Sequence, residues 1–217
     1  NTIYCSPLGR AKQTLEQLVD KLPELPLVFS PGSNWNYSVS TDVVGRLVEV
    51  ISGKPLDVFF EENIFKPLGM HDTSFTISDE KRHRLMHNYS RSPIDGKITL
   101  ADSPDRTIYA PGREFLSGGG GLLSTVSDYH KFADMMRRGG STPTARILSR
   151  KTVAYMTSNH LPDNDTLVNR ALGSFSEVTY LGTGFGLGFS VVVDPAQTST
   201  VSSKGNYSWG GLASTIF

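Results

Sequence analysis

The segment between Phe29 and Gly53 constrains the fold more than any other part of the sequence. Pro31-Gly32 is a turn signal, and the residues after it, as far as Tyr37, are typical of a short extended piece. Ser40 or Thr41 can cap a helix over 41–52, because apolar residues then recur at helical spacing. These are Val43, Val44, Leu47, Val48 and Ile51. The sequence therefore predicts a turn, an extended piece and a helix with one apolar face.

Tyr37 lies a few residues before the N-terminus of that predicted helix. The positive end of the helix dipole favours a phenolate at this place if the ring points toward it. Tyr37 could then serve as a general base or a proton relay. It could equally be an aromatic side chain that packs beside the turn, and spacing alone favours this structural interpretation.

Composition excludes some classes of partner. The chain has 217 residues, with 21 Lys plus Arg and 21 Asp plus Glu, so its formal net charge is zero. Proteins that bind nucleic acid or anionic membranes carry a basic excess, so we expect neither partner. No apolar run is long enough to span a membrane. The single cysteine, Cys5, excludes an internal disulfide and fits a reducing, cytoplasmic location.

Periodicity and turn residues predict the other elements. Helices are predicted over 11–22, 55–64, 125–138 and 147–156, a hairpin tip at 94–97, a polar loop over 157–183, and strands over 185–193 and 208–217. In the third of these helices, Thr125 and Asp128 have the spacing of a capping box.

Several motifs are better explained as structural. No Gly-Lys-Ser/Thr follows the glycine run of 118–121, so close packing and tight turns explain it better than nucleotide binding. His83 and His87 are four residues apart, but Arg84 stands where a zinc protease has glutamate. We therefore expect no metal and no cofactor. One Ser-x-x-Lys occurs, at Ser78 and Lys81, in a charged segment that would not desolvate the lysine, and we interpret it as a chance match.

The two ends of the chain suggest a piece of a longer protein. The sequence begins at Asn1 without an initiator methionine. It stops at Ser214-Thr215-Ile216-Phe217, whose β-branched and aromatic residues are typical of a strand interior. We expect the remaining N-terminal and C-terminal parts of the same protein to be its partners in folding.

A set of short motifs, in the same order along the chain, resembles the serine β-lactamase-like hydrolases. This superfamily holds class C β-lactamases, DD-peptidases and family VIII carboxylesterases. The motifs are Phe29-Ser30-Pro31-Gly32, Trp35-Asn36-Tyr37-Ser38, Ile64-Phe65-Lys66-Pro67-Leu68-Gly69-Met70, Ser117-Gly118-Gly119-Gly120-Gly121-Leu122, Gly184-Phe185-Gly186-Leu187-Gly188-Phe189 and Tyr207-Ser208-Trp209-Gly210-Gly211. Two segments look most like the esterase branch: Tyr37-Ser38-Val39-Ser40 and Tyr207-Ser208-Trp209-Gly210-Gly211.

The resemblance implies roles for particular residues. In the family a Ser-x-x-Lys supplies the acylated serine upstream of everything matched here, which supports setting Ser78 aside. Tyr37 corresponds to the general base of the Tyr-x-Asn motif, and Val39 replaces its asparagine. Trp209-Gly210-Gly211 corresponds to Lys-Thr-Gly, with Trp209 in place of the cation. The backbone N–H of Leu212 would be the second oxyanion-hole donor.

These implied roles favour one function among three. The resemblance implies an α+β fold of the β-lactamase/transpeptidase type, with an antiparallel sheet flanked by helices and a mostly helical inserted domain. In this chain it implies a mostly helical region over 1–182 and strands of the central sheet over 183–217. Val39 and Trp209 make the implied cleft apolar, which favours a serine carboxylesterase for small-molecule esters. The alternatives are a peptidase, amidase or weak β-lactamase, and a non-catalytic scaffold or binding protein. Because the implied nucleophile is not within the chain, we expect the chain alone to be inactive.

Overall fold

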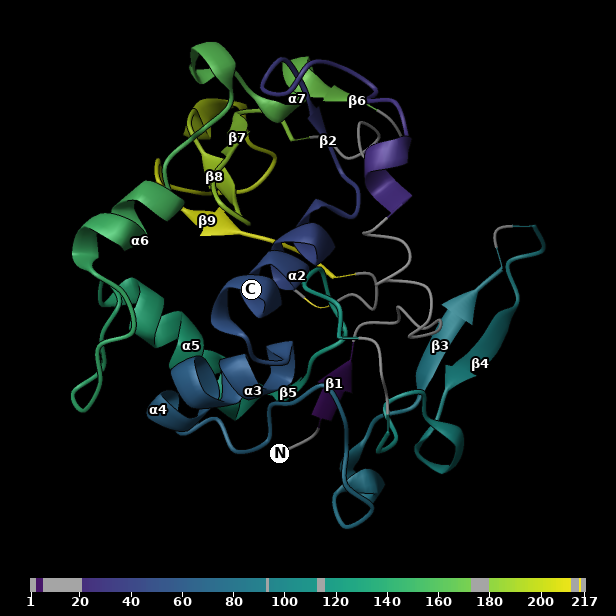
Figure 1. Cartoon of the computed structure of the whole chain (residues 1–217). Coiled ribbons are helices and arrows are strands. Elements are labelled where there is room, and N and C mark those ends of the chain that lie inside the picture. The colour runs from purple at the N-terminus through teal and green to yellow at the C-terminus, as the bar shows by residue number, and fades with distance from the viewer. Residues whose placement is uncertain are drawn as a thin grey trace. The chain divides into compact units, whose positions relative to one another are not determined.

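The computed structural model describes residues 3–5, 21–92, 94–112, 116–172, 180–211 and 215 (Figure 1). They fall into two compact units built from alternating segments of the chain. The first unit comprises Asn1–Glu24, Ser40–Met135 and Gly211–Thr215, and the second comprises Leu25–Val39, Met136–Gly210 and Ile216–Phe217. Most of the helix predicted over 11–22 lies outside the described residues. The boundary predicted at residue 182 stays a prediction.

The first unit contains most of the helices. Its elements are β1 (Ile3–Cys5), η1 (Leu22–Glu24), α2 (Ser40–Ser52), α3 (Leu56–Phe60), η2 (Glu61–Phe65), α4 (Lys66–Leu68), η3 (Arg82–Arg84), β3 (Asn88–Arg91), β4 (Ile98–Asp102), η4 (Pro104–Arg106), β5 (Leu123–Thr125) and α5 (Val126–Arg137). β1 pairs antiparallel with β5, and β3 pairs antiparallel with β4 across the predicted hairpin tip. Its core includes Phe75, Ile77, Leu85, Tyr109 and Leu123.

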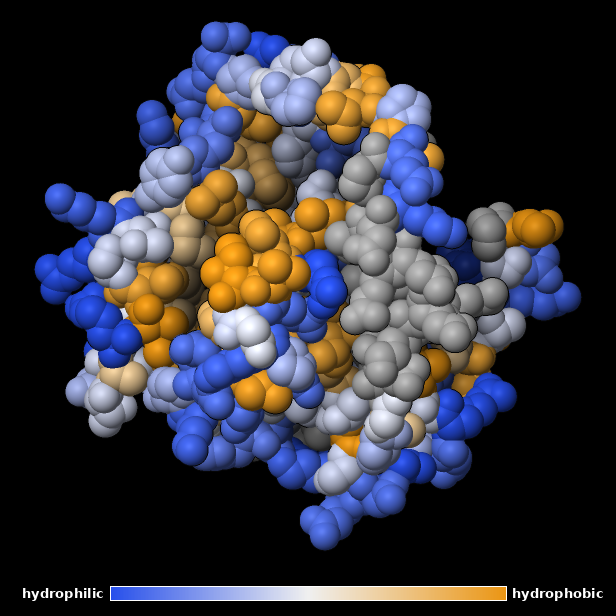
Figure 2. Space-filling view, viewed as in Figure 1, coloured by the Kyte–Doolittle hydropathy of each residue, from blue (hydrophilic) through white to orange (hydrophobic). Residues whose placement is uncertain are grey.

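Helix α2 forms where the sequence predicts it, but its apolar face is exposed. Four apolar residues of the helix are between 52% and 76% exposed: Val44, Leu47, Val50 and Ile51. Figure 2 shows the corresponding hydrophobic patch near the middle of the view, where α2 lies in Figure 1. Helical spacing of apolar residues ordinarily marks the face that packs on a core. Here Gly45 is the buried residue of the helix.

Close packing against the glycine run explains this orientation. A β-carbon added at Gly118 would lie 2.2 Å from the carbonyl oxygen of Thr41 and 3.0 Å from the α-carbon of Gly45. Asp42 accepts hydrogen bonds from the Ser117 hydroxyl and from the Gly119 N–H. The glycine run therefore lets the backbone of α2 approach a loop closely, and the prediction that it serves close packing is confirmed.

Two leucines of this region give a matched test of the orientation. Leu47 is 52% exposed on α2, whereas Leu56, at the start of α3, is 1% exposed. We expect Leu56→Ala to lower the free energy of unfolding by about 2–5 kcal/mol, and Leu47→Ala to change it by only about 0.5 kcal/mol. Urea unfolding of the two variants measures both values. Equal losses would contradict the exposed position of Leu47.

The segment from α3 through η2 to α4 is one continuous helical stretch with a wider π-type turn over Glu61–Phe65. Pro67 follows that turn. Proline has no N–H and clashes with the carbonyl four residues before it, and a π-turn is one way for a helix to accommodate this. The stretch buries Leu56, Phe65 and Leu68, and it ends at Gly69 in the left-handed conformation.

The second unit contains β2 (Trp35–Asn36), α6 (Arg150–Met156), η5 (Pro162–Asn164), α7 (Leu167–Arg170), β6 (Ala171–Leu172), β7 (Thr183–Phe185), β8 (Ser190–Val192), η7 (Pro195–Gln197) and β9 (Tyr207–Ser208). β2 pairs parallel with β6, and β7, β8 and β9 form an antiparallel sheet in that order. Helix α6 begins after Ser149, whose hydroxyl accepts a hydrogen bond from the Thr152 N–H.

Three predictions for this unit need correction. The predicted polar loop over 157–183 contains α7 and β6, with Leu167 fully buried. The predicted strand over 185–193 is a hairpin of β7 and β8, because the chain turns at Leu187-Gly188, where Gly188 has φ +95°. In the strand predicted over 208–217, β9 ends at Ser208, and 212–214 and 216–217 lie outside the described residues. Within the part of the chain that is described, no helix is long and apolar enough to cross a membrane.

Candidate active site

The short parallel pair of β2 and β6 holds Trp35 in the second unit. Arg170, the last residue of α7, donates to the carbonyl oxygen of Ser33 just before β2 (3.3 Å). The same guanidinium is paired with Asp165 (Nε to Oδ2, 2.8 Å) and Asp163 (Nη2 to Oδ2, 2.9 Å). Arg170 therefore ties the turn that precedes β2 to the segment that forms β6.

The sheet of β7, β8 and β9 positions the other aromatic residues of the unit. The Ser190 hydroxyl on β8 donates to the carbonyl oxygen of Ser208 (2.8 Å), directly before Trp209. Phe185 is the last residue of β7, and its N–H donates to the side-chain oxygen of Asn159 (3.0 Å). A β-carbon at Gly184 would lie 2.2 Å from that oxygen, so glycine allows the contact. These bonds fix the strand ends from which Phe185 and Trp209 extend.

Four aromatic side chains surround Trp209 and form a group of five with it. The rings of Tyr37 and Tyr180 lie parallel to the indole, with centroids 6.0 Å and 5.7 Å from it and interplanar angles of 13° and 2°. Trp35 and Phe185 contact the indole edge-on, at 6.2 Å and 5.3 Å. The fold therefore brings together Tyr37 and Trp209, which lie near opposite ends of the chain. We call these five residues the aromatic cluster.

Tyr180 belongs to this cluster and was missed by the sequence analysis, which placed it in a polar loop. Burial raises the pKa of its phenol, and the neighbouring Tyr37 adds to the effect. Tyr180 therefore stays protonated at neutral pH. In the sequence Tyr180 is a single aromatic residue three positions before β7, with no periodicity that would have marked it as a site residue.

The other predicted site residues are distributed differently. Val39 is half-buried in the second unit, two residues after Tyr37, and Gly210 is exposed directly after Trp209. Gly211 belongs to the first unit, where its N–H donates to the carbonyl oxygen of Thr215 (2.6 Å). Leu212, the predicted oxyanion-hole donor, lies outside the described residues. The structure therefore brings Tyr37 and Trp209 into contact, and the roles of all six residues stay predictions.

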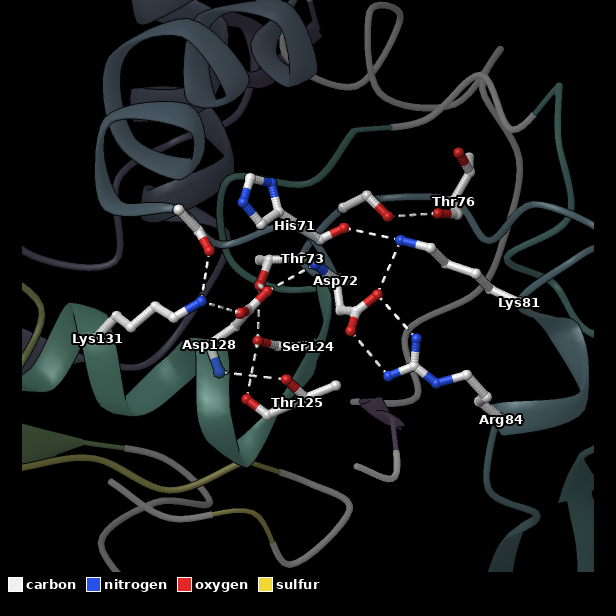
Figure 3. A network of polar contacts seen from close by, with 12 residues as sticks. His71, Asp72, Thr73, Thr76, Lys81, Arg84, Ser124, Thr125, Asp128 and Lys131 are labelled. Atoms are coloured by element: carbon white, nitrogen blue, oxygen red, sulfur yellow. Dashed lines mark hydrogen bonds and ion pairs between the residues drawn. The ribbon is translucent and has the colours of Figure 1, made fainter.

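Lys81, the lysine of the Ser-x-x-Lys match that begins at Ser78, lies in a polar network of the first unit (Figure 3). The Lys81 ammonium is paired with Asp72 (Nζ to Oδ1, 2.8 Å) and donates to the carbonyl oxygen of His71 (2.8 Å). A serine nucleophile needs its base within hydrogen-bond reach, and these contacts of the Lys81 ammonium go to a carboxylate and a carbonyl oxygen instead. This pairing supports the interpretation of Ser78 as a chance match.

Asp72 also binds Arg84 through two hydrogen bonds, Nη1 to Oδ1 (2.9 Å) and Nη2 to Oδ2 (2.8 Å). The hydrogen bonds from Arg84, and then those from Lys81, hold the pKa of Asp72 well below its usual range. A carboxylate with a lowered folded-state pKa adds stability above its unfolded pKa of about 3.9, and this is lost as the pH falls through the folded value.

The lowered pKa of Asp72 predicts how the stability of the Asp72→Asn variant depends on pH. We expect the variant to be less stable than the wild type by about 1–2 kcal/mol at pH 7, with the difference shrinking below about pH 4. Urea unfolding between pH 2 and pH 7 measures it. Asp79→Asn is the control, because Asp79 is 81% exposed in its pair with Arg82, and its difference should stay near zero. A constant Asp72→Asn difference down to pH 2 would contradict the assignment.

The network continues to the start of α5 (Figure 3). Asp128 is buried, and its carboxylate accepts from the Asp72 N–H (2.6 Å) and the Thr73 hydroxyl (3.2 Å) and pairs with Lys131 (2.8 Å). Its own N–H donates to the Thr125 hydroxyl (3.2 Å), which is the helix cap predicted from the sequence. Among the described residues, no group of three or more His, Cys, Asp or Glu side chains could hold a metal.

Comparisons with known proteins agree with this architecture. Protein Rv1367c of Mycobacterium tuberculosis is 32% identical over 96% of this chain and 53% of its own length. Esterase EstB of Burkholderia gladioli is 29% identical over 91% of this chain and 49% of its own length. The chain therefore spans about half the length of the curated relatives it matches.

A solved structure gives the same picture. EstCE1, described as a hydrolase with promiscuous acyltransferase activity, superposes with a TM-score of 0.71 at 26% identity, covering 95% of this chain and 53% of its own. The similar proteins therefore include one described as an esterase and one described as a hydrolase. The family model described as Beta-lactamase matches residues 4–217. The chain therefore belongs to the beta-lactamase family, and its fold is the α+β, β-lactamase/transpeptidase-like fold that the sequence predicted.

Proposed function

We propose that the whole protein is a serine carboxylesterase that hydrolyses small carboxylic esters through an acyl-enzyme. The observation that carries the proposal is the contact between Tyr37 and Trp209 inside the aromatic cluster. Where β-lactam-binding relatives carry a cation, this chain has a tryptophan whose described ring contacts are all aromatic. Such surroundings favour the apolar acyl or alkyl part of a neutral ester over an anionic substrate.

The proposed mechanism is a two-step acyl transfer. The nucleophile is the serine of a Ser-x-x-Lys motif outside residues 1–217, because the family order places that motif before the tyrosine motif. The serine oxygen attacks the ester carbonyl while its proton passes to the lysine and Tyr37. The N–H of Leu212 donates to the oxyanion of the tetrahedral intermediate, together with the N–H of the nucleophile.

Collapse of that intermediate breaks the bond to the alcohol, which leaves with a proton from Tyr37. Water then attacks the carbonyl carbon of the acyl-enzyme and gives a proton to Tyr37. The bond between the acyl group and the serine oxygen breaks, the serine oxygen takes that proton back from Tyr37, and the carboxylic acid leaves. Val39, Trp209, Gly210 and Gly211 are the proposed substrate-binding residues. No cofactor takes part in these steps.

A second candidate is acyl transfer to an alcohol instead of water. The description of EstCE1 as a hydrolase with acyltransferase activity supports it. Both reactions share the acyl-enzyme and differ in the second nucleophile. Product analysis in water–alcohol mixtures separates them, because a transferase forms a new ester at alcohol concentrations at which an esterase forms mainly the acid.

The experiment that tests the proposal uses the whole protein and a panel of substrates. We expect turnover of p-nitrophenyl acetate and butyrate, and much weaker turnover of nitrocefin and of a D-alanyl-D-alanine peptide. Preferred turnover of the peptide or nitrocefin would favour the peptidase or β-lactamase alternatives. No turnover of any substrate, with no labelling by a fluorophosphonate, would favour the non-catalytic scaffold and overturn the proposal.

A further inference from the structure

We propose that Tyr180 is a positioning residue of the same site, which holds the Trp209 indole so that the indole in turn fixes the ring of Tyr37. The inference rests on the proposed function for its catalytic consequence. Its structural part stands on the aromatic cluster alone. Tyr180, Trp209 and Tyr37 all lie in the second unit.

Trp209 lies directly after the end of β9. β9 ends at Ser208, which pairs with Ser190 of β8 and accepts a hydrogen bond from the Ser190 hydroxyl at its carbonyl oxygen, directly before Trp209. Beyond that point the described contacts of the indole are ring contacts. Aromatic pairs prefer offset-parallel or edge-on arrangements at centroid distances of about 4.5–7 Å. All four contacts of Trp209 fall in this range, two of each kind.

The ring of Tyr37 packs against the indole of Trp209. Tyr37 is 42% exposed, so the protein interior does not enclose its ring. Its ring contacts include Trp35, tilted by 50° at 6.3 Å, and Trp209, which is nearly parallel. A general base needs its oxygen within hydrogen-bond reach of the proton it accepts. The near-parallel contact with the indole is therefore one restraint on the direction in which the Tyr37 oxygen points.

The ring of Tyr180 also packs against the indole of Trp209. Its ring is the most nearly parallel partner of the indole, at an angle of 2°. Because burial raises its pKa, Tyr180 stays neutral and does not compete with Tyr37 for the role of base. What Tyr180 supplies is the ring, so phenylalanine should replace it and alanine should not.

The experiment compares three variants of the whole protein. We expect Tyr180→Ala to lower kcat for p-nitrophenyl butyrate by about three- to tenfold, the effect of losing one aromatic pair, with KM changed by less than about twofold. Tyr180→Phe should keep kcat within about twofold of the wild type. Tyr207→Ala is the matched control, because Tyr207 is a half-buried tyrosine of the same unit that packs on Phe189 and should leave kcat unchanged.

Each outcome decides the proposal. A kcat loss in Tyr180→Ala that Tyr180→Phe restores and Tyr207→Ala lacks would support positioning. An unchanged kcat in Tyr180→Ala, or an equal loss in Tyr207→Ala, would overturn it. If the wild type hydrolyses no ester, the proposed function fails, and near-UV circular dichroism tests the structural part. Loss of the tryptophan bands in Tyr180→Ala but not in Tyr180→Phe would support it, and unchanged bands would overturn it.

Discussion

Tyr37→Phe in the whole protein is expected to lower kcat for a small ester by about 10²–10⁴-fold, the usual contribution of a general acid–base group. Phenylalanine keeps the ring that contacts Trp35 and Trp209 and removes the oxygen that carries the proton. KM and the free energy of unfolding should therefore change little. Steady-state kinetics with p-nitrophenyl butyrate and urea unfolding measure the two quantities.

The control for this variant is Tyr207→Phe, which removes a phenol oxygen from the same unit outside the aromatic cluster. It should leave kcat unchanged. If Tyr37→Phe keeps kcat within about threefold, Tyr37 is not the base, and the structural interpretation of this tyrosine holds instead. A large loss of stability without a specific loss of kcat would lead to the same conclusion.

Asp128→Ala is expected to lower the free energy of unfolding by about 3–5 kcal/mol, because it leaves a buried N–H and an ammonium without their charged partner. The carboxylate it removes accepts from the Asp72 N–H and the Thr73 hydroxyl and pairs with Lys131. These bonds join the start of α5 to the segment after α4. Urea unfolding followed by circular dichroism measures the change.

The matched control is Glu62→Ala, because Glu62 is 49% exposed and pairs with the equally exposed Lys54. Surface ion pairs contribute little, so the loss should stay below about 1 kcal/mol. Asp128→Asn should fall between the two, since the amide oxygen still accepts from backbone while the charge is lost. A loss below about 1 kcal/mol in Asp128→Ala would show that the network does not hold α5.

The positions of the helices could be predicted well from the sequence, and their orientations less well. The apolar spacing and the cap residues placed α2 and α5 within a few residues of their observed bounds. Spacing says which residues share a face, but it does not say on which side the rest of the unit lies. In α2, Gly45 and the polar Asp42 face the glycine run, and Val43, Val44 and Val50 are exposed.

Strands were predicted less accurately for a different reason. The run from Phe185 to Val193 reads as continuous, since a glycine inside an apolar run fits a strand as well as a turn. Only the pairing of Phe185 with Ser190 shows that the chain reverses between them. The short β6 has no alternation to detect, and its pairing partner, β2, comes from a distant part of the chain.

The candidate site could be predicted only in part. Tyr37 and Trp209 were found through the family resemblance, because nothing in the local pattern links two motifs so far apart. Their contact needs the tertiary fold, which brings β2 and β9 together in one unit. Tyr180 could not be found from its surroundings in the sequence, since a single aromatic residue before a glycine-rich strand has no periodicity. Its role depends entirely on the parallel contact with Trp209.

The central claim is that the whole protein forms an acyl-enzyme on a serine of a Ser-x-x-Lys motif outside residues 1–217. Intact-protein mass spectrometry after an acid quench of the reaction with p-nitrophenyl butyrate tests this claim directly. We predict one butyryl adduct, which peptide mapping assigns to that serine. The adduct accumulates in the Tyr37→Phe variant when deacylation is its slower step. Turnover without any adduct, or an adduct on Ser78, would contradict the account.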